Sequence, residues 1–143
     1  MELSILFLPL IASIISGFFG RYIGDRNSEI VTSALVSISA ILSIIVLYQV
    51  IVNQYEENIV IATWINSGSL DVNWSMLIDP LSAVMLVVVT SVSALVHIYS
   101  IGYMSHDPHK PRFMAYLSLF TFAMLMLVTS DNFIQLFFGW EGV

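Results

Sequence analysis

Four long apolar segments dominate the sequence. Each can cross the hydrocarbon core of a membrane, which takes about 20 helical residues. The segments run approximately from Leu3 to Tyr22, Ile30 to Val52, Leu81 to Tyr103 and Phe113 to Ser130. A further apolar segment begins near Asn132 and reaches the last residue, Val143. We therefore predict an all-α integral membrane protein with four transmembrane helices and the start of a fifth.

The composition excludes several other classes of protein. Of the residues, 58% are hydrophobic and 10% are charged, and the mean hydropathy is +0.91. These values exclude a soluble globular domain and a disordered chain. The formal net charge of −6 argues against nucleic-acid binding and against a polybasic lipid-binding surface. Because the sequence has no cysteine, disulfides, thiolate metal sites and cysteine nucleophiles are excluded.

The four basic residues predict the orientation in the membrane. Arg21 and Arg26 lie between the first and second segments, and Lys110 and Arg112 lie between the third and fourth. By the positive-inside rule, these two loops face the cytoplasm or its equivalent. The fifth helix then runs inward from the outer surface. No basic residue precedes the first segment, so we expect that segment to be a retained helix and not a cleaved signal peptide.

The outer loop between the second and third segments contains two β-rich runs. They extend from Asn58 to Ile65 and from Leu70 to Met76, and a polar, glycine-containing stretch separates them. This pattern predicts a short surface β-hairpin. Asp79 and Pro80 follow it, and they provide an N-cap carboxylate and a first-turn proline for the third helix.

Glu141 is the candidate functional residue. If the fifth helix starts near Asn132, Glu141 lies about ten residues into it, which corresponds to a depth of about 15 Å. That depth is near the bilayer midplane, where an ionised side chain costs several kcal/mol and usually marks an ion or proton path. The alternatives are a fixed buried ion pair and a helix that starts later. Gly139 and Gly142 flank Glu141 and would let a neighbouring helix approach closely.

Other polar residues have simpler interpretations. Asp131 is expected to cap the fifth helix, as Asp79 caps the third. His97 would lie roughly 25 Å along the third helix, near its inner boundary. A packed or interfacial histidine is favoured there over a proton relay. The inner loop also contains His106, Asp107 and His109. We interpret this stretch as a polar turn and not as a metal site.

The C-terminal segment indicates that more chain follows. A helix that ended at Val143 would leave its terminal carboxylate and several carbonyl groups in hydrocarbon, where no water can bond to them. We therefore expect an N-terminal piece of a longer membrane protein, with the partner of Glu141 on the remainder.

Four motifs resemble one family of membrane proteins. They are Asp79–Ser82 (DPLS), His97–Met104 (HIYSIGYM), Arg112–Tyr116 (RFMAY) and Gly139–Val143 (GWEGV). Together they resemble the largest antiporter-like subunit of the proton-translocating NADH:quinone oxidoreductase, complex I. This subunit is called subunit L in bacteria and chain 5 in mitochondria. The glutamate motif alone is shared with sister subunits and with the large subunit of multisubunit sodium/proton antiporters.

The resemblance implies a division of the chain. Residues 1–112 would hold helices one to three with the outer hairpin and the inner loop. Residues 113–143 would begin the antiporter-like proton-translocating domain; in this family the fourth to eighth and the ninth to thirteenth helices form two inverted repeats. Glu141 would match the family's glutamate on the fifth helix, which takes part in proton translocation and pairs with an intramembrane lysine on a later helix.

The resemblance also implies partners and excludes cofactors. FMN, iron–sulfur clusters and quinone would bind other subunits, so this chain would hold no cofactor, no metal and no NADH. Its partners would be other complex I membrane subunits, the lipid bilayer and protons. The membrane would be the bacterial cytoplasmic membrane, or alternatively the mitochondrial inner membrane. Two other functions stay open, namely the large subunit of a cation/proton antiporter and a structural scaffold with Glu141 in a static ion pair.

Overall fold

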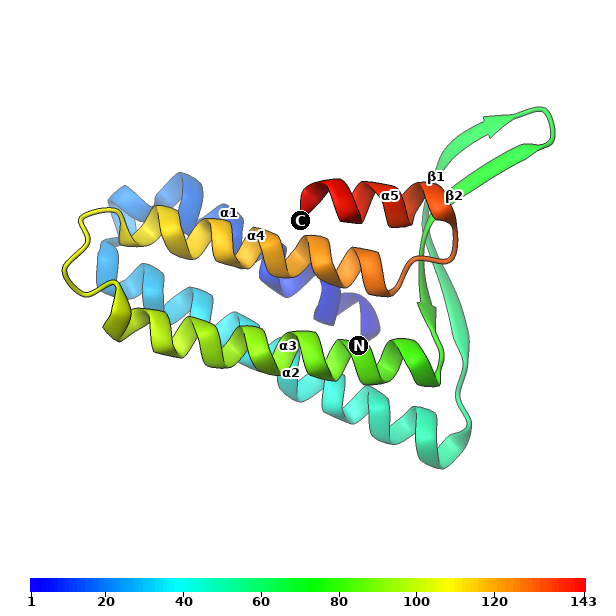
Figure 1. Ribbon diagram of the computed structural model, residues 1–143, viewed down its shortest axis with the longest axis horizontal. Helices are drawn as coiled ribbons and strands as arrows, with labels where there is room; N and C mark the ends of the chain where they lie inside the picture. Colours follow the sequence, from blue (N-terminus) through cyan, green and yellow to red (C-terminus); the bar gives the residue numbers. More distant parts are fainter.

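The computed structural model describes residues 1–143 as five helices and one antiparallel β-hairpin (Figure 1). The helices are α1 (Glu2–Ile23), α2 (Asp25–Asn53), α3 (Pro80–Tyr103), α4 (Lys110–Val128) and α5 (Phe133–Gly142), and the strands are β1 (Glu57–Ser67) and β2 (Leu70–Ile78). By length and composition, α1 to α4 can each cross a membrane. The predicted fold class, with a hairpin between the second and third helices, is confirmed.

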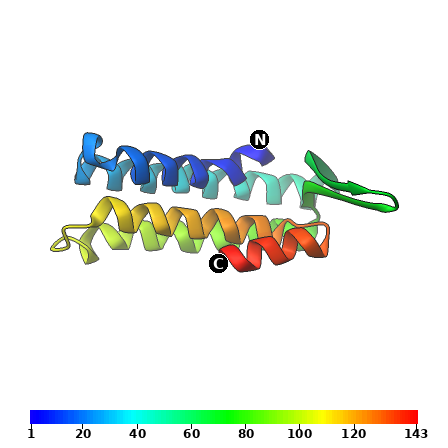
Figure 2. The same ribbon diagram turned by 90° about the horizontal axis from the view of Figure 1, so that it is seen from above.

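The helices form an antiparallel bundle in two layers (Figure 2). One layer contains α1 and α2, and the other contains α3, α4 and α5. Within the bundle, α2 packs on α1 and α3, and α4 packs on α1 and α5. The α1–α2 and α3–α4 connections lie at one end, and the hairpin lies at the opposite end (Figure 1). All four basic residues are therefore at the end opposite the hairpin, as the predicted orientation requires.

The second helix begins earlier than the sequence predicted. α2 starts at Asp25, and the only residue between it and α1 is Gly24, which has φ 90°. A side chain would be strained in that conformation, so glycine suits the connection. The predicted start at Ile30 is wrong because an acidic residue such as Asp25 is favourable in the first turn of a helix. As a result Arg26 belongs to α2 and not to a loop.

The hairpin is longer than predicted, and only part of it is a surface feature. Gly68, with φ 62°, and Ser69 form a two-residue turn at the tip, which projects away from the bundle (Figure 1). At the base, Met76 and Ile78 of β2 are fully buried. The hairpin therefore contributes side chains to the core of the bundle.

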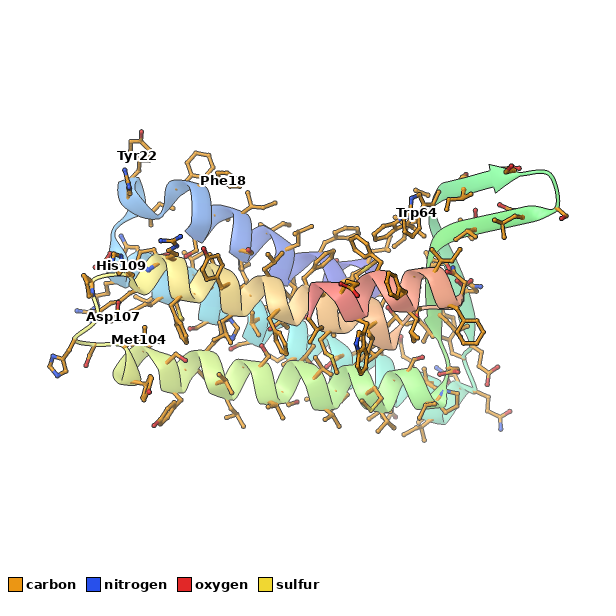
Figure 3. The ribbon with its side chains drawn as sticks, turned by 45° about the horizontal axis from the view of Figure 1, so that its top comes forward. Phe18, Tyr22, Trp64, Met104, Asp107 and His109 are labelled. Carbon is orange, nitrogen blue, oxygen red and sulfur yellow. The ribbon has the colours of Figure 1, made fainter.

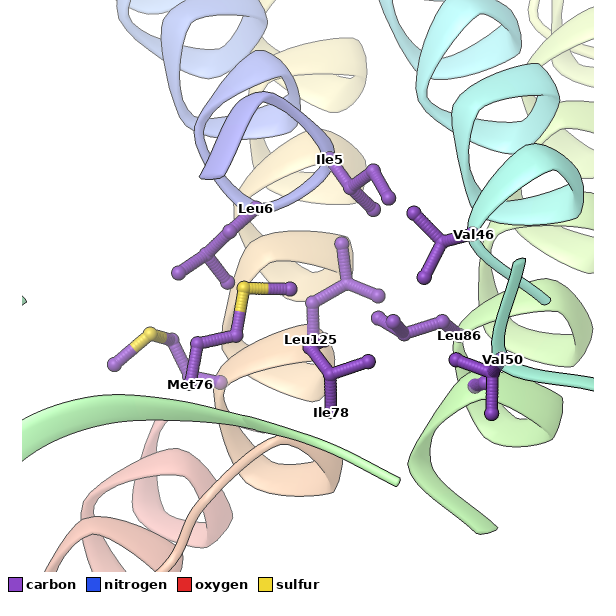
Figure 4. Close-up of a cluster of buried hydrophobic side chains, with 10 residues drawn as sticks. Ile5, Leu6, Val46, Val50, Met76, Ile78, Leu86 and Leu125 are labelled. Carbon is purple, nitrogen blue, oxygen red and sulfur yellow. The ribbon is translucent and has the colours of Figure 1, made fainter. Parts of the chain in front are cut away.

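The main hydrophobic core lies at the hairpin end (Figure 4). It joins side chains from every long helix to the base of β2; those labelled are Ile5, Leu6, Val46, Val50, Met76, Ile78, Leu86 and Leu125. Helix association within hydrocarbon depends on close packing and hydrogen bonds, because lipid is as apolar as the side chains. At this end, where the hairpin meets the bundle, removal of apolar side chains from water also stabilises the contact.

Candidate functional site

α5 runs along α4 from the hairpin end and carries Glu141 near its C-terminal end. Its N-cap is Asn132, whose side-chain oxygen accepts a hydrogen bond from the Gln135 backbone N–H at 2.7 Å. Glu141 follows the first helical residue, Phe133, by eight positions, which corresponds to about 12 Å along the axis. The helix therefore begins close to where the sequence predicted.

Asp131 is not the cap of α5, so that prediction is wrong. Its carboxylate instead accepts hydrogen bonds from the side-chain amides of Asn58 at 2.8 Å and Asn132 at 2.9 Å. Partial burial would raise the pKa of Asp131, but the neighbouring Ser75 hydroxyl and the two amides outweigh that effect, so the pKa lies below its ordinary value. The ionised carboxylate thus links β1 to the start of α5.

Gln135 fixes α5 to the open edge of β2. Its side chain is completely buried. The side-chain oxygen accepts from the Ser75 N–H at 3.1 Å, and the side-chain nitrogen donates to the Ser75 carbonyl at 2.7 Å. The amide therefore satisfies both backbone groups of one strand residue, in the way that a neighbouring strand would.

The same edge is bonded at the alternate residues on either side of Ser75. The carbonyl of Asn73 accepts from the side chain of Asn132 at 2.9 Å. The N–H of Leu77 donates to the carbonyl of Thr129 at 2.8 Å. Alternate residues along a strand present their backbone groups to the same side. The α4–α5 connection therefore covers this edge of β2 and withholds it from pairing with another strand.

The glycines that flank Glu141 pack against α4. A Cβ added at Gly139 would lie 2.8 Å from the backbone nitrogen of Leu127, and one added at Gly142 would lie 3.0 Å from the Cβ of Ala123. The close helix approach predicted at these two glycines is confirmed. It leaves the face of α5 that carries Glu141 directed away from α4.

Glu141 itself is exposed on α5. The one ion pair within residues 1–143 joins the amino group of Met1 to Glu2 at 3.3 Å, so none of the basic residues pairs with Glu141. Lys110, the single lysine, is in the first turn of α4 at the opposite end of the bundle. A lysine partner for Glu141 stays a prediction.

His97 is fully buried between α3 and α4. Its Nδ1 lies 2.7 Å from the carbonyl oxygen of Ser93, and its Nε2 lies 3.0 Å from the hydroxyl of Ser118. Because a carbonyl can only accept, Nδ1 carries a hydrogen. The hydroxyl of Ser93 also bonds to that of Thr121 across the same interface. These contacts support the interpretation of His97 as a packed histidine.

Two further polar predictions are confirmed. Asp79 caps α3 by accepting from the Ser82 N–H at 2.6 Å. In the inner loop, Asp107 accepts from the His109 N–H at 2.7 Å (Figure 3). A side chain that bonds the backbone two residues onward is typical of a polar turn.

Glu29 is a buried carboxylate that sequence reasoning missed. Its side chain is 5% exposed, and one of its oxygens has no hydrogen-bond partner. Glu29 lies one residue before Ile30, where the second segment was predicted to start. Its helical spacing from the small or apolar residues Ser33, Val36 and Ala40, which are all buried, is the signal that would have placed it on the inner face of α2.

The close contact at Gly139 makes a testable prediction. We expect Gly139→Ala in the full-length protein to lower the free energy of unfolding by about 1–3 kcal/mol, because the new methyl group would force α4 and α5 apart. The thermal unfolding midpoint of the purified protein measures this effect. Gly102→Ala is the matched control, since a Cβ there meets nothing within 4 Å. Equal midpoints for the two variants would contradict close packing of Gly139 against α4.

Comparison with known proteins identifies the family. Residues 64–114 match the family described as NADH-Ubiquinone oxidoreductase (complex I), chain 5 N-terminus. The chain is 57% identical over 143 residues to NADH-ubiquinone oxidoreductase chain 5 of Arabidopsis thaliana and of Triticum aestivum. The alignment covers 100% of this chain and 21% of each relative. It is 55% identical over 141 residues to chain 5 of Phytophthora infestans, and that alignment covers 99% of this chain and 21% of the relative.

The chain thus spans about a fifth (21%) of the length of these relatives. The aligned region includes all four motifs on which the resemblance was based, residues 139–143 among them. The resemblance is therefore confirmed, and the chain belongs to the NADH-ubiquinone oxidoreductase (complex I) chain 5 family.

Proposed function

We propose that this chain is part of a membrane-arm subunit of NADH:quinone oxidoreductase that couples electron transfer on other subunits to proton translocation. The observation that carries the proposal is the 57% identity to chain 5 proteins along the whole chain. A second support is the carboxylate of Glu141, which α5 holds about 12 Å along a helix that begins beside the outer hairpin.

Glu141 takes its role from simple electrostatics. A carboxylate beside a buried ammonium group stabilises the charged form of that group. When the carboxylate is neutralised or moves away, the ammonium loses this stabilisation and gives up its proton. The two groups titrate as a coupled pair. In this proposal the ammonium belongs to a lysine beyond residue 143, and Glu141 faces it with the side of α5 that does not pack on α4.

The proposal assigns no redox chemistry to this chain. FMN, iron–sulfur clusters and quinone are placed on other subunits, and this chain binds neither NADH nor a metal. The lack of cysteine supports this assignment, because iron–sulfur clusters are held by cysteine thiolates. The partners are other membrane subunits of the complex, lipid and protons.

The helices and the relatives make this a multi-pass membrane protein. The location in a bacterial cytoplasmic membrane stays a prediction. The relatives do not support it, because they come from the eukaryotes Arabidopsis thaliana, Triticum aestivum and Phytophthora infestans. They are consistent with the mitochondrial inner membrane, which was the alternative.

The proposal is tested on the full-length protein in its native complex, reconstituted into sealed vesicles. We expect proton uptake to begin on addition of NADH and quinone, and mass spectrometry to find flavin and iron–sulfur subunits in the same complex. Sodium-dependent proton exchange without NADH, in a complex of membrane subunits alone, would identify a cation/proton antiporter instead. If the complex without this subunit still transferred electrons with unchanged proton uptake, the chain would be a structural scaffold.

A further inference from the structure

A cavity of about 450 Å³ lies at the inner end of the bundle. It is open on one side and is lined by the end of α1, the start of α2, the α3–α4 loop and the first two turns of α4. The charged and aromatic side chains on its lining are Arg21, Asp25, His109, Arg112 and Tyr116. None of these residues has a part in the path proposed for Glu141.

The charge of this cavity is positive. Neither Arg21 nor Arg112 forms an ion pair with a carboxylate, and Asp25 is the only acidic residue on the lining. The lining thus carries two guanidinium groups and one carboxylate, and His109 adds two ring nitrogens. A guanidinium group binds phosphate oxygens through two parallel hydrogen bonds, which makes arginine the preferred residue for this anion.

The arginine on α4 is held in place. The Nε of Arg112 donates to the hydroxyl of Tyr116 at 2.9 Å, and its guanidinium carbon lies 5.7 Å from the centroid of the same ring. Guanidinium has five N–H donors, so this contact orients the group and leaves the others available to a ligand.

The wall between α1 and α4 is tightly built. The hydroxyl of Ser16 donates to the carbonyl of Pro111 at 2.6 Å, and a Cβ added at Gly20 would lie 2.6 Å from the Cβ of Pro111. Small residues at these positions let the first turn of α4 approach α1 closely. The backbones of α1 and α4 that form this wall of the cavity are thus closely packed.

The cavity lies where a membrane boundary is expected. Phe18 and Tyr22 of α1 are 78% and 88% exposed, and they extend from α1 near the end where His109 lies (Figure 3). Exposed aromatic residues next to basic residues are typical of the inner interface of a membrane protein. Lipid phosphates occupy that level, so a lipid headgroup is the anion that the position favours.

We propose that this cavity binds the phosphate of an anionic phospholipid, with Arg21 and Arg112 as the cationic contacts. The exposed apolar side chains of α1, such as Ile14 and Phe18, then provide a surface for the acyl chains. The net charge of −6 argues against a polybasic lipid-binding surface, and the proposed site is not of that kind. It needs only two arginines, which the fold brings together from separate helices.

The test uses the full-length protein in its complex and a photoactivatable phosphatidylglycerol that carries its reactive group near the headgroup. Mass spectrometry of the labelled peptides locates the bound lipid. We expect labelling in the segments 16–26 and 108–116, with little labelling by the matched phosphatidylcholine reagent. In the double variant R21Q/R112Q, labelling should fall by about tenfold, because both guanidinium groups that would bind the phosphate oxygens directly are lost.

The double variant R26Q/K110Q is the matched control. It removes the same charge from the same end of the bundle, and neither residue lines the cavity, so it should be labelled as the wild type is. Equal labelling of the two double variants would overturn the proposal. So would equal labelling by phosphatidylcholine in the wild type, a result that needs no variant to fold. Complete competition by inorganic phosphate would assign the site to a free anion, and crosslinking to another subunit in place of lipid would make it a protein interface.

Discussion

Replacing Glu141 by glutamine in the full-length protein should reduce NADH-driven proton translocation by about tenfold or more. An opposite charge within about 4–6 Å changes the protonation equilibrium of its partner by roughly one to three pKa units, and glutamine removes that charge at nearly constant volume. Because Glu141 is exposed on α5 and α5 is anchored by other residues, electron transfer and assembly should persist. The measurement is protons moved per NADH oxidised in sealed vesicles.

Glu141→Asp and Glu57→Gln are the controls for this variant. Aspartate keeps the charge with a shorter side chain, so it should restore part of the translocation. Glu57 is an exposed carboxylate on β1, and its loss should change nothing. An unchanged proton-to-electron ratio in Glu141→Gln would refute the role given to this residue. Loss of the complex with a normal ratio in what remains would favour a static ion pair.

Replacing Gln135 by leucine should lower the free energy of unfolding by about 2–6 kcal/mol. Leucine has a similar volume but leaves both backbone groups of Ser75 buried without a partner, and each such group costs about 1–3 kcal/mol. The loss should appear as a lower thermal unfolding midpoint of the full-length protein. Hydrogen exchange should also become faster in the β2 peptide that contains Ser75, because the edge of the strand would open.

Gln49→Leu controls for the replacement itself, since Gln49 is a half-buried glutamine within α2 that does not contact the hairpin edge by hydrogen bonding. It should leave the exchange of β2 at the wild-type rate. Identical exchange in Gln135→Leu and wild type would show that the hydrogen bonds between Gln135 and Ser75 do not hold β2 against α5.

Local chemistry made some elements predictable and left others ambiguous. The cap of α3 followed from Asp79 and Pro80 because both act within one turn of their own helix. The cap of α5 did not, because Asp131 and Asn132 are adjacent and either can cap. The choice depends on Asn58, which is 73 positions away in the sequence and bonds to Asp131. A tertiary contact of that kind has no sequence signature.

The same distinction applies to the candidate site. The spacing of Gly139 and Gly142 predicted a close helix approach, and α4 provides it. Gln135 gave no such signal, because its partner strand residue is 60 positions away and a lone glutamine in an apolar segment looks like an ordinary polar substitution. The lysine partner proposed for Glu141 stays a prediction, because no basic residue within 1–143 pairs with it.

The pairing of Gln135 with Ser75 also sets how the protein responds to bilayer thickness. A helix held only by lipid adjusts to a thicker or thinner membrane by tilting or sliding. A slide of α5 by one residue, about 1.5 Å, would break both hydrogen bonds to Ser75 at once. We therefore expect the long helices around α5 to take up a mismatch, and Glu141, six positions beyond Gln135, to keep a constant distance from the hairpin.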